Sequence, residues 1–264
     1  MPRVAAKIGA VALRTVTATR YVMPLREGGS LPGLVEADDD GLYVVKFRAA
    51  GQGLKALVAE VLVGRLAQTA GLAVPELVLV ELDAALGRAE PDPEINELVT
   101  RSAGLNLGID FLPGALDFNP AVPGAVGSEL ASDIVWFDAW TTNVDRTARN
   151  PNMLVWHRRI WLIDHGAAIY RHHSDDHLAE RAREPFPLIR DHVMLQMAAD
   201  LDGADERMTA RLGPEQIDVA LAGVPDEWLG TEPRHERLAY RTYLERRLEY
   251  HREFAREAIA ARGA

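Results

Sequence analysis

The stretch that decides the fold is TTNVDRTARNPNMLVWHRRIWLIDHGAA, residues 141–168, in which two short apolar runs lie on either side of the polar triplet HRR. This pattern is typical of a β-hairpin whose turn lies near residues 157–159. In that register Trp156 pairs with Ile160. The polar residues that flank the two runs should therefore meet at the open end of the hairpin.

Counting back from the turn pairs Asn152 with Asp164, so that an amide and a carboxylate lie side by side. Their oxygens are hard ligands that suit Mg²⁺. This ion takes few ligands from the protein, because water and phosphate oxygens fill its other positions. Asp145 lies a short loop upstream, near enough to act on a substrate hydroxyl. A base, a metal-binding asparagine and a metal-binding aspartate form one half of a kinase site.

The other half of such a site is a lysine on a strand, a carboxylate on the following helix and a loop over the phosphates. Lys46 lies among apolar strand positions in YVVKF, and Glu60 is the only acid in the apolar helical stretch LKALVAEVLVGRLAQ. A buried charge without a partner is costly, so we expect these two side chains to pair. The segment that offers backbone amides to phosphates contains Gly28, Gly29, Ser30 and Gly33.

Each of these features is common by itself, and their order along one chain is what indicates a kinase. The predicted elements give an α+β, two-lobed, protein-kinase-like fold. We expect strands at 15–23, 42–47 and 77–82 and one main helix at 53–71.

A Gly- and Pro-rich tract, residues 113–127, separates this region from a part that carries the hairpin and is mostly helical from about residue 175. We therefore expect a small, β-rich N-terminal lobe, residues 1–113, that binds nucleotide. A larger, mostly helical C-terminal lobe, residues 114–264, should carry the catalytic loop and the metal site.

The composition limits the partners of the chain. It has 264 residues, a hydrophobic content of 48% and a formal net charge of −10, which suits a soluble globular protein and disfavours nucleic acid and anionic membranes. No apolar run approaches the roughly 18–20 residues needed to span a bilayer. The absence of cysteine excludes thiolate metal sites and a cysteine nucleophile, and it fits a reducing compartment, so we expect a cytoplasmic location.

Four runs resemble the HipA-like kinases, relatives of a bacterial Ser/Thr kinase. They are PLREGGSLPGLVEADDDGLYVVKF, GLKALVAEVLVGRLAQTAGLAVPE, GLNLGIDFLP and NVDRTARNPNMLVWHRRIWLIDHGAA, and they extend from about residue 15 to residue 170. The resemblance is not evident over the C-terminal helices. It implies ATP and Mg²⁺ as cofactors and a hydroxyl as the phosphate acceptor, with Ser or Thr of a protein as the expected substrate.

The resemblance also implies roles for individual residues. Lys46 contacts the α- and β-phosphates and pairs with Glu60. Asp145 is the catalytic base, and Asp164 holds Mg²⁺. The linker LGIDFLP, residues 107–113, is the hinge to the adenine through backbone groups, with Asp110, Phe111 and Leu112 as the expected contacts.

Three assignments stay open. The usual interval after the base points to Asn150 as the metal-binding amide, whereas the hairpin register and the following MLV favour Asn152. Arg146 either neutralises charge on the transferred phosphate or forms a structural salt bridge. The acceptor is a protein hydroxyl or, alternatively, a small molecule, and a scaffold that binds nucleotide without catalysis is a further alternative.

Overall fold

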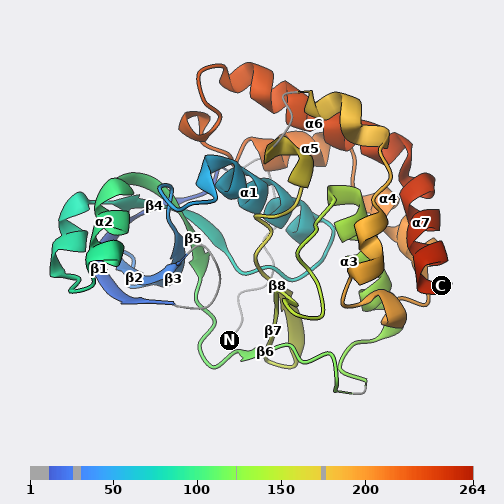
Figure 1. Ribbon diagram of the computed structural model, residues 1–264, viewed down its shortest axis with the longest axis horizontal. Coiled ribbons are helices and arrows are strands. Elements are labelled where there is room, and N and C mark those ends of the chain that lie inside the picture. Colours follow the sequence, from blue (N-terminus) through green and yellow to red (C-terminus); the bar gives the residue numbers. More distant parts are fainter. Residues whose placement is uncertain (1–11, 26–30, 123, 174–176, 264) are drawn as a thin grey trace.

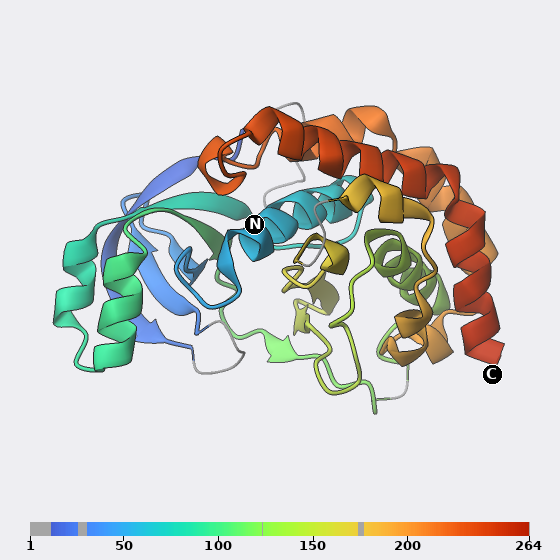
Figure 2. The same ribbon diagram turned by 45° about the horizontal axis from the view of Figure 1, so that its top comes forward.

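The computed structural model describes residues 12–25, 31–122, 124–173 and 177–263 (Figure 1). A barrel of β-strands at one end of the molecule lies next to a part made mainly of helices (Figures 1 and 2). None of the helices in these ranges combines the length and the apolar character needed to cross a lipid bilayer.

The barrel consists of β1 (Thr15–Pro24), β2 (Gly33–Ala37), β3 (Leu42–Lys46), β4 (Leu77–Leu82) and β5 (Gly104–Asp110). Their spatial order is β1-β2-β3-β5-β4, and all neighbours are antiparallel except β1 and β4, which are parallel. Val35, Val45, Val78 and Val80 are fully buried in the barrel core, since β-branched side chains pack well on a pleated surface. The sequence predicted β1, β3 and β4 and left a short strand or helix open in the stretch that contains β5, but it did not indicate β2.

Helix α2 (Pro93–Arg101) and a 3₁₀ helix (Ala84–Ala89) pack together beside the barrel (Figure 1). Ile95 and Val99 of α2 are buried in the barrel core. The polar face of α2 points away from this contact, as expected for an amphipathic surface helix.

Helix α1 (Gly53–Thr69) lies between the barrel and the other helices (Figures 1 and 2). Every residue from Ala56 to Ala67 is buried, as expected for a helix that is apolar on all faces. The chain leaves the helix at Gly71, whose φ of 87° is a left-handed conformation that glycine adopts without strain. Because α1 is enclosed on all sides, a charge on it must find its partner inside the protein.

The helical part contains α3 (Ser128–Thr141), α4 (Leu201–Arg211), α5 (Pro214–Leu221), α6 (Pro233–Glu249) and α7 (His251–Gly263). Helix α3 is its centre and packs against α4, α6 and α7, with Trp136, Phe137 and Trp140 fully buried. The core of this part is continuous with α1, which packs against α5. The boundary near residues 113–127 therefore stays a prediction.

The chain forms short 3₁₀ helices at Tyr170–His173, Leu178–Arg183, Pro187–Asp191 and Leu195–Met197, although the sequence predicted mostly helix from about residue 175. Pro185 and Pro187 explain part of this difference, because proline removes a backbone donor and restricts the residue before it.

The predicted hairpin exists, but its register is shifted by one residue. Strands β7 (Met153–Trp156) and β8 (Arg159–Leu162) pair Trp156 with Arg159, and β6 (Leu116–Asp117) joins β7 to complete a three-stranded sheet. The turn has two residues, with φ of 47° and 63°, and such turns match the twist of the strands. The prediction that Trp156 pairs with Ile160, and Asn152 with Asp164, is therefore wrong.

Candidate active site

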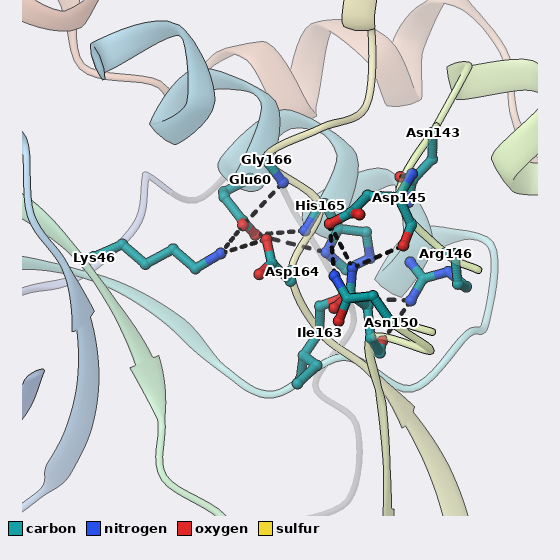
Figure 3. A network of polar contacts seen from close by, with 11 residues as sticks. Lys46, Glu60, Asn143, Asp145, Arg146, Asn150, Ile163, Asp164, His165 and Gly166 are labelled. Atoms are coloured by element: carbon teal, nitrogen blue, oxygen red, sulfur yellow. Dashed lines mark hydrogen bonds and ion pairs between the residues drawn. The ribbon is translucent and has the colours of Figure 1, made fainter. Parts of the chain in front are cut away.

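Lys46 ends strand β3 and is 8% exposed. Its Nζ atom pairs with the carboxylate of Glu60, from the middle of α1, and lies 2.7 Å from Asp164 Oδ1 (Figure 3). Burial alone would lower the pKa of Lys46, but the two neighbouring carboxylates outweigh it, and the pKa is raised. The lysine therefore stays charged, and the predicted pair with Glu60 has a third member in Asp164.

Glu60 is 1% exposed and connects three elements. Besides pairing with Lys46, it accepts hydrogen bonds from the backbone amides of His165 and Gly166, both at 2.9 Å (Figure 3). Burial would raise the pKa of Glu60, but Lys46 and the side chain of His165, whose Nδ1 atom lies 3.8 Å from Glu60 Oε2, hold it well below its usual range. The carboxylate thus fixes β3, α1 and the segment after Asp164 to one another.

Gly166 is a site residue that the sequence analysis missed. A Cβ atom at this position would lie 3.2 Å from Glu60 Oε1 and 3.6 Å from Ala56 Cβ, so the glycine lets the chain pass close to α1. Its place two residues after Asp164 is the signal that could have identified it.

Asp164 follows β8 with a φ of 54°, a left-handed conformation that aspartate tolerates better than most residues. Its side chain is 37% exposed and points toward Lys46 (Figure 3). Burial and the nearby Glu60 carboxylate raise the pKa of Asp164, although Lys46 opposes this. The site thus concentrates negative charge beside one lysine.

Asp145 lies in the loop between α3 and the hairpin, together with both candidate amides. Its Oδ2 atom accepts hydrogen bonds from Asn150 Nδ2 at 2.8 Å and from Asn152 Nδ2 at 3.2 Å. Asn150 is exposed, whereas Asn152 is 8% exposed and directly precedes β7. The backbone amide of Ile163 donates to the Asn152 carbonyl at 3.0 Å. The structure therefore brings Asp145, Asn150, Asn152 and the residue before Asp164 into one cluster.

Arg146 is 1% exposed, and its side chain points into the protein. Its Nε atom lies 2.5 Å from Asp138 Oδ2, on α3. Of the two roles expected for Arg146, the geometry supports the structural salt bridge. The direct contact of Arg146 with a transferred phosphate stays a prediction.

The predicted phosphate loop falls largely outside the described residues, since Gly28, Gly29 and Ser30 are not among them. Gly33 is described, and it begins β2. A Cβ atom there would lie 2.6 Å from the ring of Tyr21 and 3.0 Å from the ring of Phe47. The glycine is required by close packing under two aromatic rings.

The first four residues of the predicted hinge, 107–110, belong to strand β5 rather than to a linker, and only residues 111–113 follow the strand. The amide of Asp110 donates to the carbonyl of Glu76 at 2.8 Å, and the amide of Phe111 donates to the carbonyl of Leu42 at 3.0 Å. Leu112 is 6% exposed. Two of the three amides in this stretch are therefore already used within the barrel.

A strand barrel next to a helical part, with a buried lysine–glutamate pair and two aspartates flanking a hairpin, defines a kinase. A family described as HipA-like kinase matches residues 19–254, and the chain belongs to this family. The match confirms the resemblance seen in the sequence and extends it over the C-terminal helices, where the sequence analysis saw none.

One solved structure supports the kinase fold, and a second is also similar to the chain. The proinflammatory kinase CtkA of Helicobacter pylori superposes with a TM-score of 0.61 at 14% identity, covering 94% of this chain and 98% of that chain. A Golgi casein kinase with Mn/ADP bound gives a TM-score of 0.48 at 15% identity, covering 97% of this chain and 75% of that chain. No curated protein sequence matches the chain.

Proposed function

We propose that the chain is an ATP- and Mg²⁺-dependent kinase that transfers the γ-phosphate to a hydroxyl, with Ser or Thr of a protein as the acceptor. The observation that carries this proposal is that Lys46 Nζ contacts Glu60 and Asp164 together, while Asp145 and two amides lie at the other side of the same hairpin end. Phosphoryl transfer requires positioning and charge neutralisation rather than covalent catalysis. These residues supply both.

The residues at the hairpin end fit a divalent cation of the Mg²⁺ type. Asp164 offers a partly exposed carboxylate, and the hydrogen bonds that the described residues make with Asn150 and Asn152 side chains involve Nδ2, which leaves the amide oxygens as ligands. Asn152 is the better candidate, because the Ile163 amide fixes its backbone beside Asp164. A bound cation would neutralise charge on the phosphates of ATP.

The remaining roles follow from position. Lys46 binds the α- and β-phosphates from the barrel side, and residues 1–113 and 114–264 form two lobes with the nucleotide between them. The hinge contacts the adenine through carbonyls of residues 110–112 and the amide of Leu112, since the other two amides are used within the barrel. Asp145 orients the acceptor hydroxyl and accepts its proton.

The test is ADP formation from Mg-ATP by the purified protein, with intact mass measured on the same sample. The parent chain is compared with Asp145→Asn and Asp164→Ala. Asp202→Asn is the matched control, because Asp202 is an exposed residue of α4 outside the site. We expect ADP formation or a gain of one phosphate in the parent and the control, and neither in the two site variants.

The other outcomes separate the alternatives. Turnover that requires an added small alcohol, and never labels protein, would assign a small-molecule acceptor. Metal-dependent ATP binding without turnover, across a panel of acceptors, would support the scaffold. A parent chain that binds no ATP would refute the nucleotide site itself.

A further inference from the structure

Asp138 is a fully buried carboxylate on α3 whose partners all lie in segments around the candidate site. Its Oδ2 atom accepts from Arg146 Nε at 2.5 Å and lies 2.9 Å from His192 Nε2. Its Oδ1 atom accepts from Asn143 Nδ2 at 3.2 Å. Three donors, two from the catalytic loop that follows α3 and one from the distant His192, therefore converge on one carboxylate.

Each donor from the catalytic loop continues to a site residue. Asn143 uses its Oδ1 atom to accept the backbone amide of Asp145 at 3.1 Å (Figure 3). Arg146 uses Nη1 to donate to the carbonyl of Asn152 at 2.5 Å and, more weakly, to the carbonyl of Ile163 at 3.4 Å. The Asp138 carboxylate is thus one side chain away from the backbone of Asp145, of Asn152 and of the residue before Asp164.

His192 brings a third segment to the same carboxylate. Its Nδ1 atom accepts a hydrogen bond from the amide of Met194 at 3.0 Å, so the ring proton lies on Nε2 and is donated to Asp138. The neighbouring backbone also docks on the catalytic loop, since the Val193 amide donates to the Arg146 carbonyl at 3.1 Å and His192 forms a β-bridge with Thr147.

A buried ion pair is weak support for stability, because desolvation offsets much of the attraction between the charges. Helix α3 carries a second pair, between Asp133 and Arg207 at 2.7 Å, which reaches α4 and contacts none of the site residues. What distinguishes the Asp138–Arg146 pair is its geometry. The guanidinium holds a carboxylate with one nitrogen and a backbone carbonyl with another, which a single ammonium cannot reproduce.

We propose that Asp138 and Arg146, with His192 as a third arm, are positioning residues: they set Asn152 in the arrangement needed to bind the metal–nucleotide complex and Asp145 in the arrangement needed to act on the acceptor hydroxyl. This inference rests on the proposed kinase function. Residues that orient metal ligands without touching the metal change affinity or activity by about 10–100-fold when replaced, and we expect effects of this size.

The experiment compares Arg146→Lys, His192→Gln and His192→Leu with the parent chain. Asp133→Asn is the matched control, because it weakens the other α3 ion pair without touching the site. Equilibrium Mn²⁺ binding in the presence of ADP is measured by electron paramagnetic resonance, together with the melting temperature and the metal dependence of ADP formation.

We expect Arg146→Lys and His192→Leu to bind Mn²⁺ with ADP about 10–100-fold more weakly than the parent. His192→Gln should recover most of the affinity, because a glutamine amide can donate from nearly the position of Nε2. Asp133→Asn should lower the melting temperature and leave Mn²⁺ binding within about twofold of the parent.

Arg146→Lys leaves Asp138 poorly paired and can fail to fold. The double replacement of Asp138→Leu with Arg146→Met leaves no unpaired buried charge, and it should fold and still lose Mn²⁺ affinity. If all folded variants keep the parent's Mn²⁺ affinity and lose only thermal stability, the positioning role is refuted while the kinase proposal stands. A parent chain that binds neither ADP nor Mn²⁺ with ADP would overturn the proposed function and, with it, this inference.

Discussion

Replacement of Glu60 by glutamine tests whether this buried carboxylate holds the site together. The carboxylate is 1% exposed and bonds to Lys46 and to the backbone amides of His165 and Gly166. Glutamine keeps the shape but has one acceptor oxygen, so its NH₂ group must face one of three donors. One buried donor then loses its partner, and Lys46 loses one of two counter-charges.

The expected cost follows from these losses. An unsatisfied buried donor costs about 1–3 kcal/mol, and a hydrogen bond to a charged group contributes about 1.5–3 kcal/mol. Lys46 still has Asp164 Oδ1 at 2.7 Å, so the full penalty of about 3–5 kcal/mol for breaking a buried pair does not apply. We expect a loss of about 3 kcal/mol, which lowers the melting temperature by about 6–12 °C in a chain of this size.

The pH dependence gives a second measure. The pKa of Glu60 is lower in the folded protein than in the unfolded chain, so its contribution to stability is present above the unfolded pKa and is lost as pH falls through the folded one. Thermal melts of the parent and Glu60→Gln should therefore differ most near neutral pH and converge under acidic conditions.

Glu81→Gln is the matched control, because Glu81 is exposed on β4 and its replacement should change stability by no more than about 0.5 kcal/mol. A Glu60→Gln chain that melts within about 2 °C of the parent at neutral pH would refute the reasoning, since its expected shift is several times larger.

Two further predictions concern a histidine and the open choice of amide. His172 is buried against Tyr240 OH, and burial lowers its pKa from 6.5 to about 3, so the unfolded chain takes up a proton below pH 6.5 that the folded chain does not. Because of this residue, the free energy of unfolding should fall by up to about 1.4 kcal/mol for each pH unit below 6.5. The free energy of unfolding of His172→Asn, measured in urea, should therefore change less between pH 6.5 and 5 than that of the parent. An equal change in both chains would contradict this. Asn152→Ala should weaken metal-dependent nucleotide binding by about 10-fold or more, and Asn150→Ala by less. Titration of Mn²⁺ in the presence of ADP measures both, and the opposite order would assign the metal to Asn150.

The kinase elements were predictable where a charge stands out in an apolar segment. Glu60 is the only acid in its helix, and Lys46 is the only charge in its strand, so each required a partner whatever the fold. The same signal was present at Asp138, within the apolar run IVWFDAW on α3, and it was missed. No comparable signal marks His192, whose partner is 54 residues away in the sequence.

The local sequence pattern predicted the hairpin but was not sufficient to predict its register. Its existence followed from two apolar runs, but its register depended on whether the turn used two or three residues. The observed turn places His157 and Arg158 in the left-handed region, where histidine is enriched among the non-glycine residues but arginine is not. The twist and pairing of the strands determined that the turn has two residues. The resulting shift of one residue in the register changed which residue lies opposite Asn152.

The sequence by itself determined the order of the kinase elements and the identity of the buried charges, because burial of a charge is dictated by the apolar residues around it. It also determined the family, through motifs whose spacing is local. Only the tertiary structure decided that Asp164 shares Lys46 with Glu60, that Arg146 points inward to Asp138, and that both asparagines reach the same oxygen of Asp145. These contacts join segments up to 118 residues apart, and their geometry depends on how α1, α3 and the hairpin pack, which no local pattern of residues specifies.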